Sequence, residues 1–365
     1  MSMLQDMLSK LNIPEWKTED VDAKNWESLR KRIIDTLLFH EYGIVPPCSF
    51  SMDCTNVSED ANFYGGKATL KTVNLTIHFV EGVASFPAWL MVPNTPGDHP
   101  LFVHINFHPG MPNRFLPAEE ICDRGYAVLE VEHNSISPDA RDDFADGLGA
   151  LLRKVARNSG VAEAQLPGKI AIWAWAASRT LDWALGQAGI CSTHIAVIGH
   201  SRLGKTALLC GALDERISCV ISNDSGCSGA AITRGKEGEH VSDIIQRFPH
   251  WFCEAYRQYA SNEMNMPFEQ DWLLAAIAPR LLLVGSSLLD KWCGPTHEYL
   301  SCVSASKAWT QLGKNGFIHP DQLPQVGDVF HQGDIGYHLR NGSHYLNRED
   351  WNNYINFLDA RGWTL

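Results

Sequence analysis

The sequence predicts a three-layer α/β sandwich, in which helices cover both faces of a mostly parallel central sheet. Three observations predict it. The 365-residue chain is 45% hydrophobic, which is enough to bury a large core. Short apolar runs alternate with longer segments of helical period along most of the chain. One run, residues 194–199, breaks at a glycine and resumes as a helical pattern, which indicates a strand, a sharp turn and a helix.

Charge and composition exclude several classes of protein. The formal net charge is −12 at pH 7 and no cluster of Lys and Arg occurs, which argues against a nucleic-acid partner. No stretch approaches the roughly 18 uncharged residues that span a bilayer, and the first ten residues lack the basic-then-apolar pattern of a secretory signal. We therefore expect a cytoplasmic protein with no nucleic-acid and no membrane partner. Nothing in the sequence predicts an oligomeric state.

The ten cysteines are scattered, with no C-x-x-C pair, and most lie in apolar runs such as residues 208–210. In a reducing compartment such residues are small core hydrophobes. Their spacing to histidines matches no common zinc motif. We therefore expect neither a metal nor a cofactor.

The amino-terminal part of the chain predicts a packing helix and two antiparallel strands. Apolar residues recur at helical spacing over residues 22–45, and the pattern ends before two prolines. Residues 68–80 and 84–92 alternate in polarity and favour β-branched types, and Glu81-Gly82 supplies the turn between them.

The middle of the chain predicts buried strands and one buried helix. Continuous apolar runs at residues 100–110 and 124–132 indicate strands of a parallel sheet, the first running into a loop. Residues 138–166 have no clear period, so we expect a surface loop near the mouth of the site. Residues 170–185 are apolar nearly all round, which predicts a buried helix.

After the strand-turn-helix segment, residues 217–222 and 279–287 predict two more buried strands. Residues 227–270 hold few strand signals and one aromatic cluster, which favours a helical cap over the sheet. A helix over residues 298–312 and a polar loop follow, and a closing helix begins near Asn347.

No repeat, low-complexity run or break in composition marks a linker. We therefore expect one domain over residues 1–365. Its amino-terminal helix and strands occupy residues 1–95, and its catalytic core occupies residues 96–365 with the cap as an insertion at about 227–270.

Ser201 lies at the apex of the predicted turn. A serine held there projects its hydroxyl clear of the sheet, beside the backbone N–H that follows it. The usual nucleophile pattern G-x-S-x-G would place glycine at position 203, but this chain has Leu203 and then Gly204. On this pattern alone, Ser201 as the N-cap of an ordinary helix is equally consistent.

Acyl transfer by serine also needs a histidine base and a carboxylate that orients it. In α/β-hydrolases these occur in the order Ser, acid, His. Here Ser201 precedes Asp224 and Asp290, each following a predicted strand, and His344 lies in the last loop before the closing helix. Position favours Asp290 slightly, and both acids stay candidates. Two histidines of the preceding loop are weaker alternatives to His344, namely His331 and His338.

Several segments in fixed order carry a family resemblance. They are Ala174-Trp-Ala-Ala-Ser-Arg-Thr-Leu-Asp182, Gly199-His-Ser-Arg-Leu-Gly-Lys205, Gly211-Ala-Leu-Asp-Glu-Arg-Ile217, Asp224-Ser-Gly226 and Pro267-Phe-Glu-Gln270 with Ala278-Pro-Arg280. Together they resemble the glucuronoyl esterases and their acetylxylan-esterase-like relatives. The resemblance covers roughly residues 95–350. It implies an α/β-hydrolase fold without metal, and the family pattern G-x-S-R-x-G-K accounts for the displaced glycine.

The resemblance implies roles for individual residues. Ser201 would be the nucleophile, His344 the base and Arg202 an oxyanion stabiliser, while Lys205 and Trp292 match positions that contact the sugar. The family acid can follow either strand, so that Asp224 stands at its unusual position and Asp290 at the alternative one. We add two candidate substrate-binding residues. His108 lies in the loop into which the strand of residues 100–110 runs, and Trp251 lies in the aromatic cluster.

Two departures from the family pattern stand out. Many secreted members join cysteines before the serine and after the histidine in a disulfide, where this chain has His200 and Tyr345. The carboxylate expected just before the Trp-Phe pair is absent from residues 246–252, which weakens the case for a glucuronate ester.

The sequence therefore predicts a serine carboxylesterase for an esterified sugar or small oligosaccharide, either an acetylated sugar or a uronate ester. The alternatives are an inactive α/β-hydrolase kept as a carbohydrate-binding or scaffold protein, and a general small-ester hydrolase.

Overall fold

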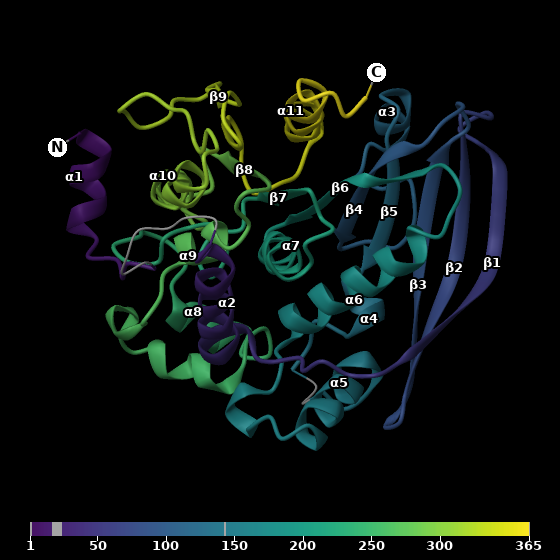
Figure 1. Ribbon diagram of the computed structural model, residues 1–365, viewed down its shortest axis with the longest axis horizontal. Coiled ribbons are helices and arrows are strands. Elements are labelled where there is room, and N and C mark those ends of the chain that lie inside the picture. The colour runs from purple at the N-terminus through teal and green to yellow at the C-terminus, as the bar shows by residue number, and fades with distance from the viewer. Residues whose placement is uncertain (1, 17–23, 142–143, 365) are drawn as a thin grey trace.

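The computed structural model describes residues 2–16, 24–141 and 144–364, and Figure 1 shows their arrangement. The described strands form one ten-stranded sheet in the order β1-β2-β3-β5-β4-β6-β7-β8-β10-β9. Their bounds are β1 Ser51–Phe63, β2 Ala68–Phe79, β3 Gly82–Pro93, β4 His99–Asn106, β5 Ala127–Glu132, β6 Ile190–His200, β7 Cys219–Asn223, β8 Leu281–Ser287, β9 Val329–Phe330 and β10 Ile335–Arg340.

The predicted three-layer α/β architecture is confirmed. From β5 to β10 in the sheet order, six neighbouring strands run parallel, while β1, β2, β3 and β9 are antiparallel to their neighbours. One apolar cluster includes residues of α6, α7 and α10, and a second includes residues of α3 and α11. Figure 1 shows α6 and α7 on one side of the sheet and α3 and α11 on the other.

Among the helices, α2, α6, α7, α10 and α11 fall close to segments predicted to be helical. The bounds of the helices are α1 Met3–Lys10, α2 Trp26–Leu37, α3 Ala118–Asp123, α4 His133–Ile136, α5 Gly147–Asn158, α6 Lys169–Ala184, α7 Arg202–Leu213, α8 Val241–Arg247, α9 Gln270–Ala275, α10 Pro295–Gln311 and α11 Arg348–Asp359. A π-helical turn, η1 Leu38–Tyr42, extends α2, and three 3-10 turns are η2 Glu163–Gln165, η3 Glu254–Tyr259 and η4 Glu263–Asn265. Residues 22 and 23 of the helix predicted over 22–45 lie outside the described residues.

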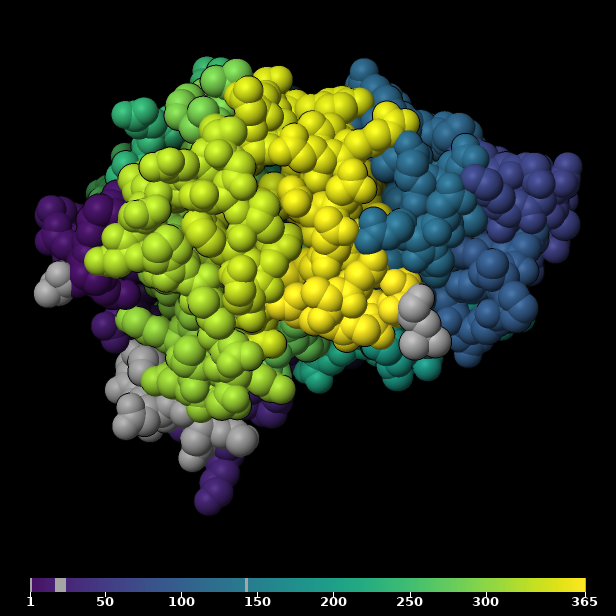
Figure 2. Space-filling model, turned by 90° about the horizontal axis from the view of Figure 1, so that it is seen from above, coloured from purple at the N-terminus to yellow at the C-terminus, as the bar shows by residue number. Residues whose placement is uncertain are grey.

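The closing helix begins where the sequence predicts. The Asn347 side chain accepts a hydrogen bond from the backbone N–H of Asp350, and the Asp350 carboxylate accepts one from the backbone N–H of Asn347. α11 lies beside α3, with Arg348 paired to Glu120. Figure 2 shows these two segments, yellow and blue, in contact on the same face.

Among the elements that differ from the prediction are α5, β1 and β10. The loop expected over residues 138–166 contains α5, whose apolar face is buried. β1 was not predicted, because its residues are mostly polar and exposed and show no alternation. β10 lies in the segment expected to be a polar loop, because it carries His338 and Arg340, whose side chains pair with the buried Asp350. Within the described residues, no helix is long and apolar enough to cross a membrane.

Candidate active site

Ser201 occupies a sharp turn between the end of β6 and the start of α7. Its φ is 59° and its ψ is −128°, a conformation that costs a non-glycine residue about 1–3 kcal/mol and that recurs at functional sites. The turn is tight because a Cβ on Gly199 would lie 2.0 Å from the carbonyl oxygen of Leu203. The Ser201 side chain makes no capping hydrogen bond to described residues of α7, so the N-cap interpretation fails.

Gly204 explains the displaced glycine of the motif. A Cβ at this position would lie 2.9 Å from the Cβ of Ser225, in the turn that follows β7. The glycine therefore lets the first turn of α7 pack against that segment. Leu203, where the commoner pattern has glycine, is fully buried as part of the core.

His344 pairs with Asp290. The Nδ1 atom of His344 lies 2.6 Å from Oδ2 of Asp290, and the Asp290 side chain is buried while the imidazole is 40% exposed. Burial acts to raise the pKa of Asp290, but the hydrogen bonds from His344 and Cys293 hold it below its usual value. The acid therefore stays ionised and keeps the proton of the neutral imidazole on Nδ1, which leaves Nε2 free to accept one.

Asp224 does not contact His344. Its carboxylate accepts hydrogen bonds from the backbone N–H and the hydroxyl of Ser287, at 2.8 and 2.7 Å, and Arg340 lies 3.6 Å away. Burial, reinforced by the neighbouring Glu298, raises the pKa of Asp224 well above its usual value. Of the two candidate acids, the fold therefore brings only Asp290 to the histidine.

The two alternative histidines lie elsewhere. His338 is fully buried in β10 and its Nε2 is 2.9 Å from Asp350. The ring of His331 packs on Phe357 of α11. Neither is among the residues that line the cavity in front of Ser201.

A cavity of about 170 Å³ opens in front of the turn. It is lined by Ser201, Arg202, Lys205, Ser225, Glu239, Arg247, Phe248, Trp251, Trp292, Cys293 and His344. The fold therefore brings together the predicted nucleophile, the predicted base and four more predicted site residues. His108 is not among the lining residues: its ring stacks on Phe115 at 5.6 Å, so its binding role stays a prediction.

Arg202 is held rigidly at one wall of this cavity. Its guanidinium pairs with Asp139 and lies over the Trp251 ring, 4.7 Å from the centroid. Asp139 also accepts hydrogen bonds from Nε2 of His250 at 2.8 Å and from Nε1 of Trp251 at 2.7 Å. Burial acts to raise the pKa of Asp139, but bonds with His133 and His250 and the charge of Arg202 hold it far below the usual value. A fixed positive group thus stands beside Ser201.

Glu239 supplies a carboxylate that the sequence analysis missed. Its Oε2 atom lies 3.3 Å from Nζ of Lys205, and its Oε1 accepts a hydrogen bond of 3.3 Å from Nε1 of Trp292. Lys205 also donates to the backbone carbonyls of Ser225 and Cys227. The cavity therefore does contain a carboxylate, which comes from a different loop than residues 246–252. No spacing rule in the sequence connects these residues.

His200 and Tyr345 stand where the resemblance places disulfide cysteines. The His200 ring packs on His344 with 4.4 Å between centroids, and its Nδ1 is 2.7 Å from Oδ1 of Asn223. Burial and the neighbouring His344 lower the pKa of His200 to about 3, so this ring stays neutral. Phe115 contacts both His200 and Tyr345, at 5.8 and 5.0 Å. Aromatic packing thus joins the strand of the nucleophile to the histidine loop, and all ten cysteines are free thiols.

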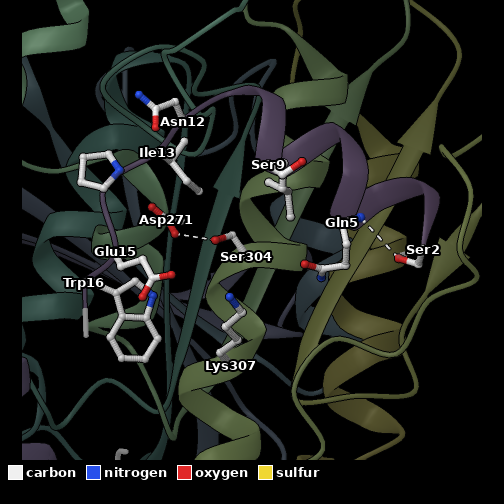
Figure 3. Close-up of a pocket in the computed structure, with 12 residues that line it drawn as sticks. Ser2, Gln5, Ser9, Asn12, Ile13, Glu15, Trp16, Asp271, Ser304 and Lys307 are labelled. Atoms are coloured by element: carbon white, nitrogen blue, oxygen red, sulfur yellow. Dashed lines mark hydrogen bonds between the residues drawn. The ribbon is translucent and has the colours of Figure 1, made fainter. Parts of the chain in front are cut away.

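A second pocket also pairs a serine with an aspartate. It measures about 420 Å³, lies between α1 and the helices α9 and α10, and contains Asp271 with Ser304, whose hydroxyl donates to the carboxylate at 2.6 Å (Figure 3). No histidine is among its described lining residues. This pair therefore lacks the histidine base that the cavity at Ser201 provides, and we take that cavity as the candidate active site.

Comparisons with known proteins agree with this site. The fungal glucuronyl esterase family profile matches residues 153–313. A curated carbohydrate esterase from an unknown prokaryotic organism is 31% identical over 94% of this chain and 86% of its own length. A 4-O-methyl-glucuronoyl methylesterase of Podospora anserina is 28% identical, and the match covers 79% of this chain and 57% of that protein.

Solved structures are similar over nearly the whole chain. A glucuronoyl esterase from Solibacter usitatus superposes with a TM-score of 0.84 and 29% identity, covering 96% of this chain and 99% of that one. A promiscuous CE15 esterase from a marine bacterial metagenome gives 0.83 and 28%, covering 95% and 98%.

Proposed function

The chain belongs to the glucuronoyl esterase family of carbohydrate esterases, and we propose that it hydrolyses the ester of a glucuronate-type sugar acid with Ser201, His344 and Asp290 as its catalytic triad. As a member it is a carboxylic ester hydrolase. The observation that carries the triad is the geometry of one cavity: Ser201 and His344 line it together, and the Nδ1 atom of His344 is held by Asp290 at 2.6 Å.

The chemistry follows from these positions. The Oγ atom of Ser201 attacks the ester carbonyl carbon while Nε2 of His344 takes its proton. When the tetrahedral intermediate collapses, the bond to the alcohol breaks and His344 returns the proton to the leaving oxygen. A water molecule, activated by the same imidazole, then hydrolyses the acyl-enzyme and frees Ser201. Asp290 orients the imidazole and stabilises the imidazolium in both halves of the reaction.

Arg202 is the proposed oxyanion stabiliser. Its backbone N–H is the first of α7, where unpaired N–H groups and the helix dipole favour negative charge. Its guanidinium is already fixed by Asp139 and Trp251, so little reorganisation is needed when charge develops on the carbonyl oxygen.

Recognition of the sugar is assigned to Lys205, Glu239 and Trp292. Each lines the cavity, and the Glu239 carboxylate is held between the other two. Charged groups in this arrangement suit the hydroxyls of a pyranose ring, and the indole offers an apolar face. A glucuronate ester is supported by the names of the family relatives, which include a glucuronoyl esterase and a 4-O-methyl-glucuronoyl methylesterase.

We also keep a cytoplasmic location as part of the proposal. The ten free thiols and the aromatic packing at His200 and Tyr345 suit a reducing compartment, where a disulfide would not persist. A cytoplasmic esterase would act on imported sugar fragments and not on an intact polymer.

The test compares hydrolysis of a glucuronate methyl ester with that of nitrophenyl acetate. We expect the glucuronate ester to have the higher kcat/KM, and Ser201→Ala to lose activity on both by at least about 10³-fold. Ser304→Ala, at the Ser304–Asp271 pair of the second pocket, is the matched control and should keep its activity.

The two arms separate the parts of the proposal. Near-normal turnover by Ser201→Ala would overturn the triad. A preference for the acetate, with Ser201→Ala still inactive, would overturn the glucuronate assignment alone.

A further inference from the structure

Cys293 places a thiol directly beside the proposed triad. Its Sγ atom lies 3.6 Å from Nδ1 of His344, which in turn lies 2.6 Å from Oδ2 of Asp290. These three atoms all lie within 4.8 Å of one another. The mechanism above uses the imidazole and the carboxylate but has no role for the thiol.

We propose that Asp290, Cys293 and His344 form a binding site for a borderline-soft divalent cation such as Zn²⁺, and that its binding inhibits the esterase. The inhibition rests on the proposed function, because it requires His344 to be the base. The binding does not depend on that function.

The donor set suits this cation. Zn²⁺ prefers thiolate, imidazole and carboxylate ligands, at about 2.3 Å for sulfur and about 2.0–2.2 Å for nitrogen and oxygen. Tetrahedral bonds of these lengths separate neighbouring ligand atoms by about 3.3–3.6 Å. The Sγ–Nδ1 separation already fits, and the Nδ1–Oδ2 pair must open by about 0.7 Å.

The surroundings allow this change. Asp290 and Cys293 are buried on one loop, where the backbone N–H of Cys293 donates to Oδ1 of Asp290 at 3.2 Å. His344 is on a different loop and is 40% exposed, so its ring supplies the movement. Cys293 and His344 line the cavity of Ser201, and Asp290 is buried behind them, so a cation can reach the three ligand atoms from that cavity.

Binding must release one proton and move another. The Cys293 thiol now donates its proton to the backbone carbonyl of Asp224 at 3.1 Å, and Nδ1 of His344 donates its proton to Asp290. The thiol proton leaves to solvent, whereas the imidazole loses its Nδ1 proton, takes one up on Nε2 and stays neutral, so the thiolate and carboxylate balance the charge of Zn²⁺. The imidazole is held by the metal in place of Asp290 and no longer gains the orientation and charge stabilisation of the triad. Inhibition should therefore appear in kcat more than in KM.

The experiment measures esterase activity and Zn²⁺ binding in parallel. Wild type, Cys293→Ser and Cys191→Ser are each assayed with and without ZnCl₂, and every rate is normalised to the metal-free rate of the same variant. Cys191 is the matched control, because its Sγ also lies near an imidazole, 3.3 Å from Nδ1 of His194. This position is more exposed and lies far from Cys293 in the sequence. Binding is measured on Ser201→Ala and on Ser201→Ala/Cys293→Ser, by competition with a chromogenic chelator.

We expect Zn²⁺ to lower kcat of the wild type at least tenfold and EDTA to restore it. Cys293→Ser should need at least tenfold more Zn²⁺ for the same inhibition, while Cys191→Ser should behave as wild type. Equal sensitivity of Cys293→Ser, or loss of sensitivity in Cys191→Ser, would overturn the site. Cys293-dependent binding in a protein that hydrolyses no ester would instead leave the site standing and overturn the proposed function.

Discussion

Asp290 and Asp224 leave neighbouring strands at the same edge of the sheet, yet they end in different surroundings. Asp290 follows β8 and meets the half-exposed imidazole of His344. Asp224 follows β7, has a φ of 43° and turns back onto Ser287 at the end of β8. The pKa of Asp290 lies below its usual value, whereas burial and Glu298 raise that of Asp224.

The comparison shows that an aspartate just after a strand end is not by its position alone a catalytic acid. Asp224 lies one residue beyond β7 and contacts Ser287 at the end of the neighbouring strand. Asp290 lies three residues beyond β8 and reaches His344. Where environments push the pKa values of two carboxyls apart, the ionised one is the better partner for an imidazolium. The contrast supports the proposal that Asp290 is the catalytic acid and that Asp224 has a structural role.

The largest expected effect is that of Asp290→Asn. The amide cannot stabilise the imidazolium and favours the wrong tautomer of His344, so kcat on a glucuronate methyl ester should fall about 10³–10⁴-fold. The melting temperature, measured by circular dichroism, should change little, since the neighbouring contacts are preserved. A loss of less than tenfold would remove Asp290 from the triad.

Asp224→Asn should reduce kcat less than tenfold. An asparagine retains a carbonyl oxygen for the Ser287 N–H and an amide that donates to the Ser287 hydroxyl, so the local structure is kept. The same steady-state assay, run beside Asp290→Asn, gives the comparison. If this variant lost as much activity as Asp290→Asn, the roles of the two acids would have to be exchanged.

Glu239→Gln tests the sugar side of the cavity. The amide weakens the contact with Lys205 and the hydrogen bonds offered to sugar hydroxyls, so KM for the glucuronate ester should rise about tenfold, which is about 1.4 kcal/mol. Turnover should stay within a few-fold, and KM for nitrophenyl acetate should hardly move. The exposed neighbour Glu237, changed to Gln, is the control. An equal KM shift on both substrates would argue against sugar recognition.

A further expected effect concerns stability and pH, not catalysis. Burial raises the pKa of Glu298 to about 7, above the value of about 4.3 in an unfolded chain. The folded protein therefore binds the extra proton, and this stabilisation is present at low pH and lost as pH rises through 7. The melting temperature should fall between about pH 5 and 8 in the wild type and fall less in Glu298→Gln. Over this pH range, the free energy of unfolding should change by about 1–3 kcal/mol less in the variant. Melting curves with the same slope in both proteins would contradict this.

The layers of the fold and the sharp turn at Ser201 could be predicted because their signals are local. Apolar runs mark the parallel strands, and the glycines on either side of Ser201 mark the turn. His344 followed from chain order once the turn was recognised. The choice between Asp224 and Asp290 could not be made in this way, since it depends on where two loops point after the strands end.

The polar contacts that hold the site together could not be predicted from the sequence, for a related reason. Asp139 holds Arg202 from 63 positions away, and Glu239 joins Lys205 to Trp292 across three separate segments. Such contacts leave no period or spacing. β10 escaped notice because burial of a charged residue such as Arg340 is possible only with a partner, Asp350, that the local pattern does not reveal.

The most direct test of the account is a double-mutant cycle of His344→Ala and Asp290→Asn on the glucuronate ester. If Asp290 acts only through His344, the double variant should have the same kcat as His344→Ala, within a few-fold. The comparison combines Asp224→Asn with His344→Ala. The small loss of kcat from the first substitution and the large loss from the second should multiply. Losses that multiply for Asp290 and His344 would contradict the triad proposed here.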